Sequence, residues 1–350
     1  MSSEGISAVV LAGTHRWSGS SFERLAARPL VPVALSPLIA YSLRWLHDGR
    51  IERATICENG SAPVIESVLG DGADLDLDLS YYKDGTPRGA AGCVRDAGLR
   101  TGAETIVVAG AAAIPTVDFD ALLASHHASR AAVTAVVHRE PPSAAPTPGG
   151  VYVFERRALY HVAETGFQDI KENLIPKLRR VGERVAAYES GGFCPQVLNA
   201  QTYLAVNQWM LQRLAHDDGG RGLVDPSAEL APGARLVGPV QLGPRVRIEA
   251  GATIVGPTTI GADSIVGENA LVARSVVWNR CHLGEESIVH GCVVGDQAVI
   301  PAGTLLFNVV RSEADGPASA HRASVWATAK AAPALPRRNP SSFLTSSTVG

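Results

Sequence analysis

The chain has 350 residues, of which 46% are hydrophobic, and a formal net charge of −3. This length and apolar content predict about two globular domains, each with a sizeable core. The charge is slightly acidic and the arginines are scattered, so there is no basic field of the kind that neutralises a phosphate backbone, and we expect no nucleic-acid partner.

The five cysteines are spread along the chain without a CxxC pair: Cys57, Cys93, Cys194, Cys281 and Cys292. This spacing fits neither a zinc site nor a disulfide framework, so we expect reduced and mostly buried thiols. The first residues, MSSEGISAVVLAG, contain no cationic segment followed by a long apolar one, and no stretch approaches the roughly 18 apolar residues of a membrane span. We therefore expect a cytoplasmic protein with no membrane partner.

From residue 6 to about residue 222, short runs of Val, Ile and Ala alternate with amphipathic segments. The strand-like runs include ISAVVLAG, RATICENG, LDLSYYKDG, ETIVVAG and AAVTAVVHRE, and helical patterns such as PLIAYSLRWLHDG lie between them. Strands that alternate with helices predict a parallel sheet covered on both faces. Its ligand site is expected beyond the carboxyl ends of the strands, two of which close with Gly13 and Gly110.

The stretch AVVLAGTHRWSGSSFERLAARPLVPV, residues 8–33, joins a strand to a polar loop and then to a Pro-rich apolar segment. Backbone N–H groups at such a junction converge on phosphates, so this loop is a candidate anion site. Further along, FDALLASHHASR places His126 beside His127. Adjacent residues of a helix point about 100° apart, so these two histidines cannot share a metal, and we expect them on a solvated face.

From residue 224 an aliphatic residue recurs at every sixth position: Val224, Leu230, Leu236, Leu242, Ile248, Ile254, Ile260, Val266 and Val272. A six-residue period predicts a parallel β-helix, in which one aliphatic residue stacks above another at each corner. The register fails near Trp278, and aliphatic residues resume at Leu283, Ile288, Val294 and Ile300. We interpret this break as one looped-out coil.

The last segment of the chain is rich in Ala, Pro and Ser and has few apolar anchors, so we expect it to be largely disordered. The predicted domains are therefore an α/β domain over residues 1–222, a hexapeptide β-helix over 223–310 and a tail over 311–350.

This layout resembles the sugar-nucleotide pyrophosphorylases, which join a nucleoside triphosphate to a sugar 1-phosphate, and is nearest to the mannose-1-phosphate guanylyltransferase type. The likeness covers roughly residues 6–310 and rests on VVLAG, RPLVPV, PLIAYSL and the repeats. It implies an α/β fold: a Rossmann-like nucleotidyltransferase domain followed by a left-handed β-helix. It also implies a nucleotide or nucleotide-sugar ligand, with Mg²⁺ as the cofactor of active members.

The family's opening motif reads approximately LAGGxGTRLxPLTxxxPKPLVPV, and here too fifteen residues separate LAG from PLVPV. By resemblance, Leu11, Ala12, Gly13 and Thr14 contact the nucleotide, and Thr14 stands at the family's second glycine. The GTR triplet becomes Arg16, Trp17 and Ser18, with Ser18 at the arginine that neutralises phosphate charge, and Arg28 stands at the lysine. The frame of the phosphate loop is kept while its chemistry has changed.

The stretch DGTPRGAAGCVRDAG resembles the family's PxGTAGA segment, where small residues let the base and ribose lie against the backbone. Gly89, Ala90, Ala91 and Gly92 keep that smallness, which predicts a nucleoside wall. The alternative is that these glycines only turn the chain into a helix.

Both aspartates that hold magnesium in the family are replaced in this chain. The first follows the strand TIVVAG, where the next residue is Ala111, and alignment on YLAVN puts Gln196 at the second position. In addition, only the linker PPSAAPTP remains where the family inserts a hairpin that grips the sugar phosphate, and Gly149 replaces the asparagine of a NAGIYVF strand. We therefore expect no metal site and no cofactor.

These losses favour a catalytically silent protein that acts as a regulatory or scaffolding subunit and binds a nucleotide or nucleotide sugar weakly. We expect it to form a homo-oligomer, or a complex with an active paralogue, through the β-helix. A second hypothesis is an active transferase with relocated metal ligands, for which Asp118 and Asp120 are candidates, although Asp118 also suits a helix N-terminus. A third is a hexapeptide acyltransferase with His282 or His290 as general base.

Overall fold

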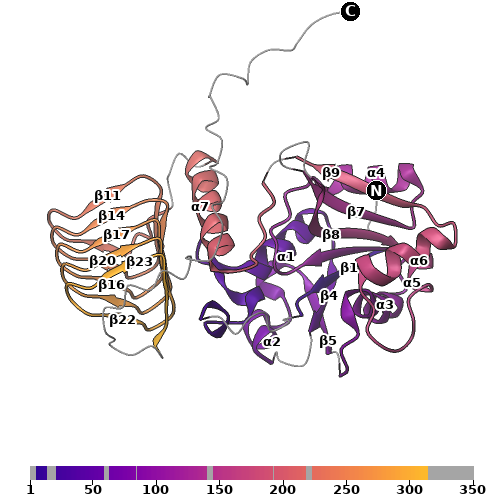
Figure 1. The fold of residues 1–350 in the computed structure, drawn as a ribbon, viewed down its shortest axis with the longest axis horizontal. Coiled ribbons are helices and arrows are strands. Elements are labelled where there is room, and N and C mark those ends of the chain that lie inside the picture. Colours follow the sequence, from indigo (N-terminus) through magenta and orange to yellow (C-terminus); the bar gives the residue numbers. More distant parts are fainter. Residues whose placement is uncertain are drawn as a thin grey trace, which may run out of the picture.

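The structure is a computed structural model in which an α/β domain and a β-helix lie on either side of one long helix, α7 (Figure 1). Most of the tail predicted over residues 311–350 lies outside the described residues. In the described part of the chain no helix has the length and apolar character needed to cross a membrane. The described residues are 5–13, 21–58, 63–83, 85–139, 145–191, 193–217 and 223–313.

A seven-stranded sheet forms the centre of the α/β domain, in the order β5-β4-β1-β6-β8-β7-β9. Strands β1, β4, β5 and β6 run parallel, as the alternating pattern predicts. Strand β8 runs antiparallel to both of its neighbours, so the expectation of a wholly parallel sheet is wrong. The connection 139–146 between β7 and β8 is too short for a crossover helix, which explains the reversal. The strands are β1 (Ile6–Leu11), β4 (Arg53–Glu58), β5 (Asp78–Lys83), β6 (Thr105–Gly110), β7 (Val133–His138), β8 (Thr147–Glu155) and β9 (Val185–Ser190).

Helices cover both faces of this sheet and bury its aliphatic side chains (Figure 1). On one face α1 (Leu38–Asp48), α2 (Pro63–Leu69) and α4 (Phe119–Ser129) pack against side chains such as Val10 and Ile56. On the other face α3 (Gly89–Thr101), α5 (Arg156–Leu159) and α6 (Ile175–Arg180) pack against Val9 and Val108. The remaining short elements are η1 (Phe22–Arg24), η2 (Arg28–Leu30), η3 (Ala73–Leu75), the π-helix η4 (Ile170–Leu174) and the pair β2 (Pro32–Val33) and β3 (Ser36–Pro37).

The C-terminal repeats form three five-stranded parallel sheets that share one aliphatic core. The first sheet contains β10 (Glu229–Leu230), β13 (Arg247–Ile248), β16 (Ile265–Val266), β19 (His282–Leu283) and β22 (Val299–Ile300). The second contains β11 (Arg235–Val237), β14 (Thr253–Val255), β17 (Leu271–Ala273), β20 (Ile288–His290) and β23 (Leu305–Phe307). The third contains β12 (Val240–Leu242), β15 (Thr258–Ile260), β18 (Val276–Val277), β21 (Val293–Val294) and β24 (Val310–Arg311).

The break in the six-residue register is a shortened strand, so the predicted looped-out coil is wrong. Paired residues lie 18 positions apart at Thr253 and Leu271 but 17 apart at Thr259 and Val276, and the later coils keep 17. Strand β15 has three residues and β18 has two, so the inward position moves by one. As a result Val289 is buried in the core, and Ile288, predicted as the aliphatic residue of that position, lies on the outside of β20.

Helix α7 (Ala200–Asp217) joins the two domains through a buried aromatic contact. The residue after three strands of the third sheet, β12, β15 and β21, is a glycine: Gly243, Gly261 and Gly295. The residue after β18 is instead the large aromatic Trp278. The indole Nε1 of Trp278 donates a hydrogen bond of 2.9 Å to the hydroxyl of Tyr203, which in turn donates to the carbonyl of Pro32. Phe22 packs on Tyr203 with ring centroids 5.0 Å apart. The third sheet, α7 and the segment after the phosphate loop therefore share one core.

We predict that Tyr203→Phe destabilises the whole chain. The substitution leaves the Trp278 N–H and the Pro32 carbonyl without their buried partner, which costs about 1–3 kcal/mol. Urea denaturation followed by tryptophan fluorescence measures the loss. Tyr160→Phe is the control, because Tyr160 is 64% exposed. Equal midpoints for the two variants would show that the hydrogen-bond chain is not needed.

Candidate functional site

The carboxyl edge of the parallel strands carries the residues expected to hold a ligand. Strand β1 ends at Leu11, which lies in register with Cys57 of β4 and Gly110 of β6. The backbone N–H of Ala12 donates to the Cys57 carbonyl at 2.9 Å, so the chain leaves β1 along this edge toward Gly13. The predicted positions Thr14, Trp17 and Ser18 lie outside the described residues.

Arg28 begins the short helix η2, between the phosphate loop and the core around α7. Burial lowers the pKa of its guanidinium to about 10, and Glu23 opposes the shift. At neutral pH the side chain still carries its positive charge. One of the cations implied by the family motif is therefore present, in a half-buried position.

The small residues from Gly89 to Gly92 form the first turn of α3 and pack against the protein itself. Gly89 has a φ of +72°, and a Cβ on it would lie 2.5 Å from the carbonyl oxygen of Gln168. A Cβ on Gly92 would lie 2.8 Å from the Cβ of Arg88. Ala91 donates its N–H to the Gln168 carbonyl at 2.9 Å. The chain's own packing thus accounts for these glycines, which agrees with the alternative that they turn the chain into a helix.

A buried ion pair that we did not predict holds this turn in place. Arg88 is 6% exposed, and its Nε donates to Asp96 at 2.9 Å. Its two terminal nitrogens donate to the carbonyls of Gly166 and Ala163. Arg88 is the N-cap of α3, and Asp96 lies about two turns further along the helix. Leu11, Ala90 and Ala91 belong to the same packed cluster, so these predicted residues lie together.

The structure also brings together Ala111 and Gln196, the two positions of the family aspartates. Ala111 donates its N–H to the Leu11 carbonyl at 3.0 Å, and its methyl group is buried. The segment around Gln196 runs beside it, since Gln196 pairs with Ala113 and Val197 donates to the Ala112 carbonyl at 2.8 Å. The Gln196 amide donates to the Pro148 carbonyl of β8. The segments that carry these two neutral side chains therefore pair with each other at this edge.

The alternative metal ligands are engaged elsewhere. Asp118 is the N-cap of α4 and accepts a hydrogen bond of 2.7 Å from the N–H of Ala121. Asp120 forms an ion pair with Arg50 at the surface. Over the described ranges, no three His, Cys, Asp or Glu residues gather in a way that could hold a metal ion. All five cysteines are free, and four of them are buried, as predicted.

The histidines proposed for other chemistry occupy separate surroundings. His282 lies on β19 and His290 on β20, in different sheets of the β-helix, so they do not form one site. The expectation that both His126 and His127 are solvated is wrong for His126, which is 1% exposed. Its ring nitrogens contact the hydroxyl of Thr134 at 2.7 Å and the carboxylate of Glu155 at 3.0 Å. His126 therefore serves as a hydrogen-bond partner for two polar side chains inside the domain.

Glu58, at the carboxyl end of β4, is a candidate that the sequence analysis missed. It is 2% exposed, and its Oε1 is one of the few buried side-chain oxygens without a partner in the described part of the chain. Burial raises the pKa of this carboxyl, Lys83 opposes the shift and Glu66 adds to it. Because β4 lies between β1 and β5, this oxygen is at the carboxyl edge beside the end of β1. The sequence feature that could have identified Glu58 is a charged residue at the end of a buried strand.

Two family models match the chain. Residues 22–172 match the model described as nucleotidyl transferase, and residues 239–274 match bacterial transferase hexapeptide (six repeats). The first match covers five of the seven strands of the sheet, β4 to β8, and leaves out β1 and β9, whereas the second lies within the β-helix.

Three curated relatives match the chain at low identity. The chain is 22% identical to the mannose-1-phosphate guanylyltransferase of Mycobacterium tuberculosis, over 72% of this chain and 79% of that protein. It is 30% identical to the probable mannose-1-phosphate guanyltransferase of Schizosaccharomyces pombe, over 34% of this chain and 31% of that protein. It is 27% identical to the bifunctional protein GlmU of Listeria welshimeri, over 43% of this chain and 34% of that protein. The chain thus spans about a third of the length of the last two.

We predict a pH-dependent effect of Glu58→Gln. Because the pKa of Glu58 is raised in the native state, this state keeps its proton above pH 4.5, where the unfolded state releases it. The stability of the parent protein therefore falls as the pH rises through the native pKa. The variant should gain stability relative to the parent by at least about 1 kcal/mol between pH 4.5 and pH 8. Denaturation midpoints across this range measure it. The exposed Glu229→Gln is the control, and a constant difference for Glu58→Gln would contradict the burial of an unpaired carboxylate.

Proposed function

We propose that this chain, which joins a nucleotidyl transferase domain to hexapeptide repeats as the sugar-nucleotide pyrophosphorylases do, is a silent member of that family. In this proposal it binds a nucleotide or nucleotide sugar weakly in the cytoplasm and acts as a scaffolding or regulatory subunit in nucleotide-sugar metabolism. The observation that carries the proposal is that the paired segments around Ala111 and Gln196 present a buried methyl group and a hydrogen-bonded amide at the two positions that, by resemblance, hold the family's metal carboxylates.

The chemistry of nucleotidyl transfer explains why these positions matter. Charge develops on the phosphate oxygens and on the departing pyrophosphate, and a bridging metal with fixed cations supplies most of the stabilisation. Neither Ala111 nor Gln196 contributes negative charge to hold such an ion. The connection 139–146 is also too short to carry the arm that grips the sugar phosphate. Arg28 remains as a cation for a phosphate.

An active transferase is the main alternative. It would need new metal ligands, and Asp118 and Asp120 are the nearest candidates in sequence to Ala111. Asp118 caps α4 and Asp120 pairs with Arg50, so neither carboxylate is available without breaking its present contact. An acyltransferase is the other alternative, with either His282 on β19 or His290 on β20 as its general base.

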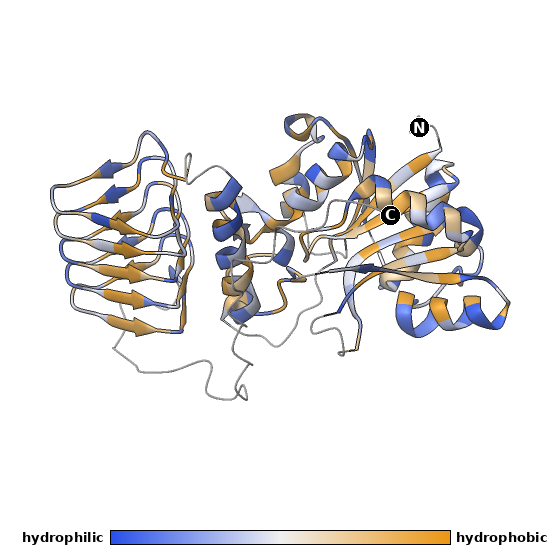
Figure 2. Cartoon of the chain, turned by 90° about the horizontal axis from the view of Figure 1, so that it is seen from above, coloured by the Kyte–Doolittle hydropathy of each residue, from blue (hydrophilic) through white to orange (hydrophobic). Residues whose placement is uncertain are grey.

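The outside of the second β-helix sheet supports a scaffolding role. The five strands of this sheet, β11, β14, β17, β20 and β23, pair in register, so their outward side chains form two columns. One column contains Leu271, Ile288 and Leu305. Phe307 ends the other column, and both Leu305 and Phe307 are about half exposed. Strands coloured as hydrophobic are prominent in the β-helix in Figure 2. An apolar surface of this kind is typical of a protein contact.

We predict that the purified protein releases no pyrophosphate above a no-enzyme control when given Mg²⁺, each nucleoside triphosphate and a panel of sugar 1-phosphates. Loss of a single charge-stabilising element costs about 10³ to 10⁵ in rate, and several are replaced here. The double variant Ala111→Asp/Gln196→Asp should also remain inactive, since metal alone does not place both substrates. Ala112→Asp/Gln196→Asp is the matched control.

Two outcomes would count against this proposal. Pyrophosphate release by the unmodified protein would establish the active alternative. Release by the Ala111→Asp/Gln196→Asp variant alone would show that the phosphate loop and the sugar site are intact. Calorimetry separates lost chemistry from lost binding, because we expect weak nucleotide binding that does not change when Mg²⁺ is removed.

We also predict that Leu305→Glu/Phe307→Glu lowers the oligomeric state. The two charges lie on the outside of β23, where burial in an interface would leave them without partners. Light scattering after size-exclusion chromatography gives the mass. Val299→Glu is the control, because Val299 is 56% exposed on the same coil but belongs to the first sheet. An unchanged mass for the double variant would exclude this face as the contact.

A further inference from the structure

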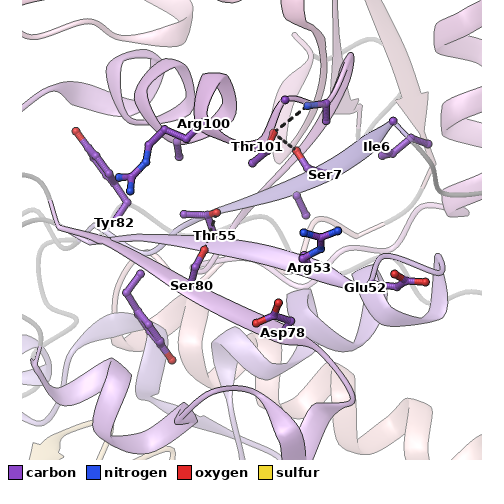
Figure 3. Close-up of a pocket in the computed structure, with 16 residues that line it drawn as sticks. Ile6, Ser7, Glu52, Arg53, Thr55, Asp78, Ser80, Tyr82, Arg100 and Thr101 are labelled. Carbon is purple, nitrogen blue, oxygen red and sulfur yellow. Dashed lines mark hydrogen bonds between the residues drawn. The ribbon is translucent and has the colours of Figure 1, made fainter.

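A cavity of about 860 Å³ opens at the amino ends of β1, β4 and β5, on the face of the sheet that carries α3 (Figure 3). Its size falls within the range of small-molecule sites. Its lining extends along β5 as far as Tyr82, which pairs with Cys57 in the register of Leu11. Its charged residues Arg53 and Asp78 begin β4 and β5, four residues before that register, or about 13 Å at about 3.3 Å per residue. These groups are not among the residues of the candidate nucleotide site.

The cavity exists because α3 covers β1 and leaves the amino ends of β4 and β5 open. Helix α3 packs on β1 through Ala97, which contributes to the core around Val9. Gly5 and Gly102 border the opening, and a Cβ on either would meet no atom within 4 Å. The opposite face of the same strands is buried by Ile56 and Leu79. Only the α3 side is free to receive a ligand.

Hydroxyl groups line the floor of the cavity. Thr55 and Ser80, on neighbouring strands, lie with their oxygens 2.9 Å apart. One hydroxyl donates to the other, so the pair keeps one proton and several lone pairs for a further partner. The ring of Tyr82 forms one wall, and its hydroxyl is held by Asp96 at 3.1 Å.

Four charged side chains surround this floor without pairing with one another. Arg53 and Asp78 lie opposite each other in register, yet they form no salt bridge. Arg100 and Glu52 likewise have no ion pair among the described residues. Figure 3 shows the guanidinium groups of Arg53 and Arg100 on the same side of the sheet as the Thr55 and Ser80 hydroxyls. The cavity therefore offers both strong donors and a strong acceptor.

Carbonyl groups at the C-terminal end of α3 would repel an anion, but two of them already accept hydrogen bonds from other side chains. Arg156 donates to the Leu99 carbonyl at 3.3 Å, and the Thr101 hydroxyl donates to the Gly98 carbonyl at 2.8 Å. The negative end of the helix dipole is thus reduced where Arg100 projects. An anion beside Arg100 then interacts mainly with the guanidinium.

We infer that this cavity binds a phosphorylated sugar. The phosphate would accept hydrogen bonds from Arg100 and Arg53, whose planar guanidinium groups suit phosphate oxygens. The sugar hydroxyls would donate to Asp78 and exchange hydrogen bonds with Thr55 and Ser80. Neither inorganic phosphate nor a free sugar satisfies both sets of groups. The inference does not require nucleotide binding at the opposite edge.

Calorimetry with glucose 6-phosphate and mannose 6-phosphate as probes tests this site. A 6-phosphate avoids competition from a subsite built for sugar 1-phosphates. We expect at least one probe to bind at least tenfold more tightly than glucose, mannose or inorganic phosphate alone. Arg100→Gln should weaken binding at least tenfold, and Asp78→Asn should weaken the sugar phosphates while leaving inorganic phosphate unchanged.

Arg247→Gln is the matched control, since Arg247 is an exposed arginine on β13 far from the cavity. The substituted residues are exposed, and melting temperatures equal to that of the parent confirm that the variants fold. The inference is wrong if no probe binds, if Arg100→Gln and Arg247→Gln have the same effect, or if inorganic phosphate binds as tightly as the sugar phosphates. A missing nucleotide signal with normal probe binding would affect only the function proposed above.

Discussion

The buried hydrogen bond between Trp278 and Tyr203 is the contact on which the arrangement of the two domains depends. Tyr203 lies in α7, Trp278 ends a strand of the β-helix, and the Tyr203 hydroxyl continues to the Pro32 carbonyl just after the phosphate loop. The buried Tyr203 hydroxyl accepts from one segment and donates to another, so it makes both hydrogen bonds only if all three segments are in place. The β-helix is therefore not an independent appendage: its third sheet completes the core that supports the base of the candidate site.

The fold was predictable where a single local pattern decides the structure. The alternation of strands and helices gave the α/β domain, and the six-residue period gave the β-helix. The wrong predictions concern features that are decided by contacts between distant segments. The direction of β8 depends on the length of a connection, the inward position after Trp278 depends on pairing with the previous coil, and the burial of His126 depends on Thr134 and Glu155 across the domain.

The residues of the candidate site remain a prediction from the motif spacing. The structure shows that Ala111 hydrogen-bonds to Leu11 and that the segment of Gln196 pairs with Ala113. Sequence reasoning did not find that Gln168 fills the space beside Gly89, because the close approach comes from a segment far along the chain. It also missed Glu58, since a single acidic residue at a strand end has no meaning until its burial and lack of a partner are known.

The shortened coils limit where the β-helix can change in length. Each coil pairs with the one before it, and the reduction to 17 residues occurs on the sheet that faces α7. An insertion at a corner between the first and second sheets would extend into solvent. The same insertion before Val276 or Val293 would push the third sheet away from Tyr203 and its neighbours. Natural and engineered insertions should therefore be tolerated at the corner between the first and second sheets and excluded from the corner that leads into the third.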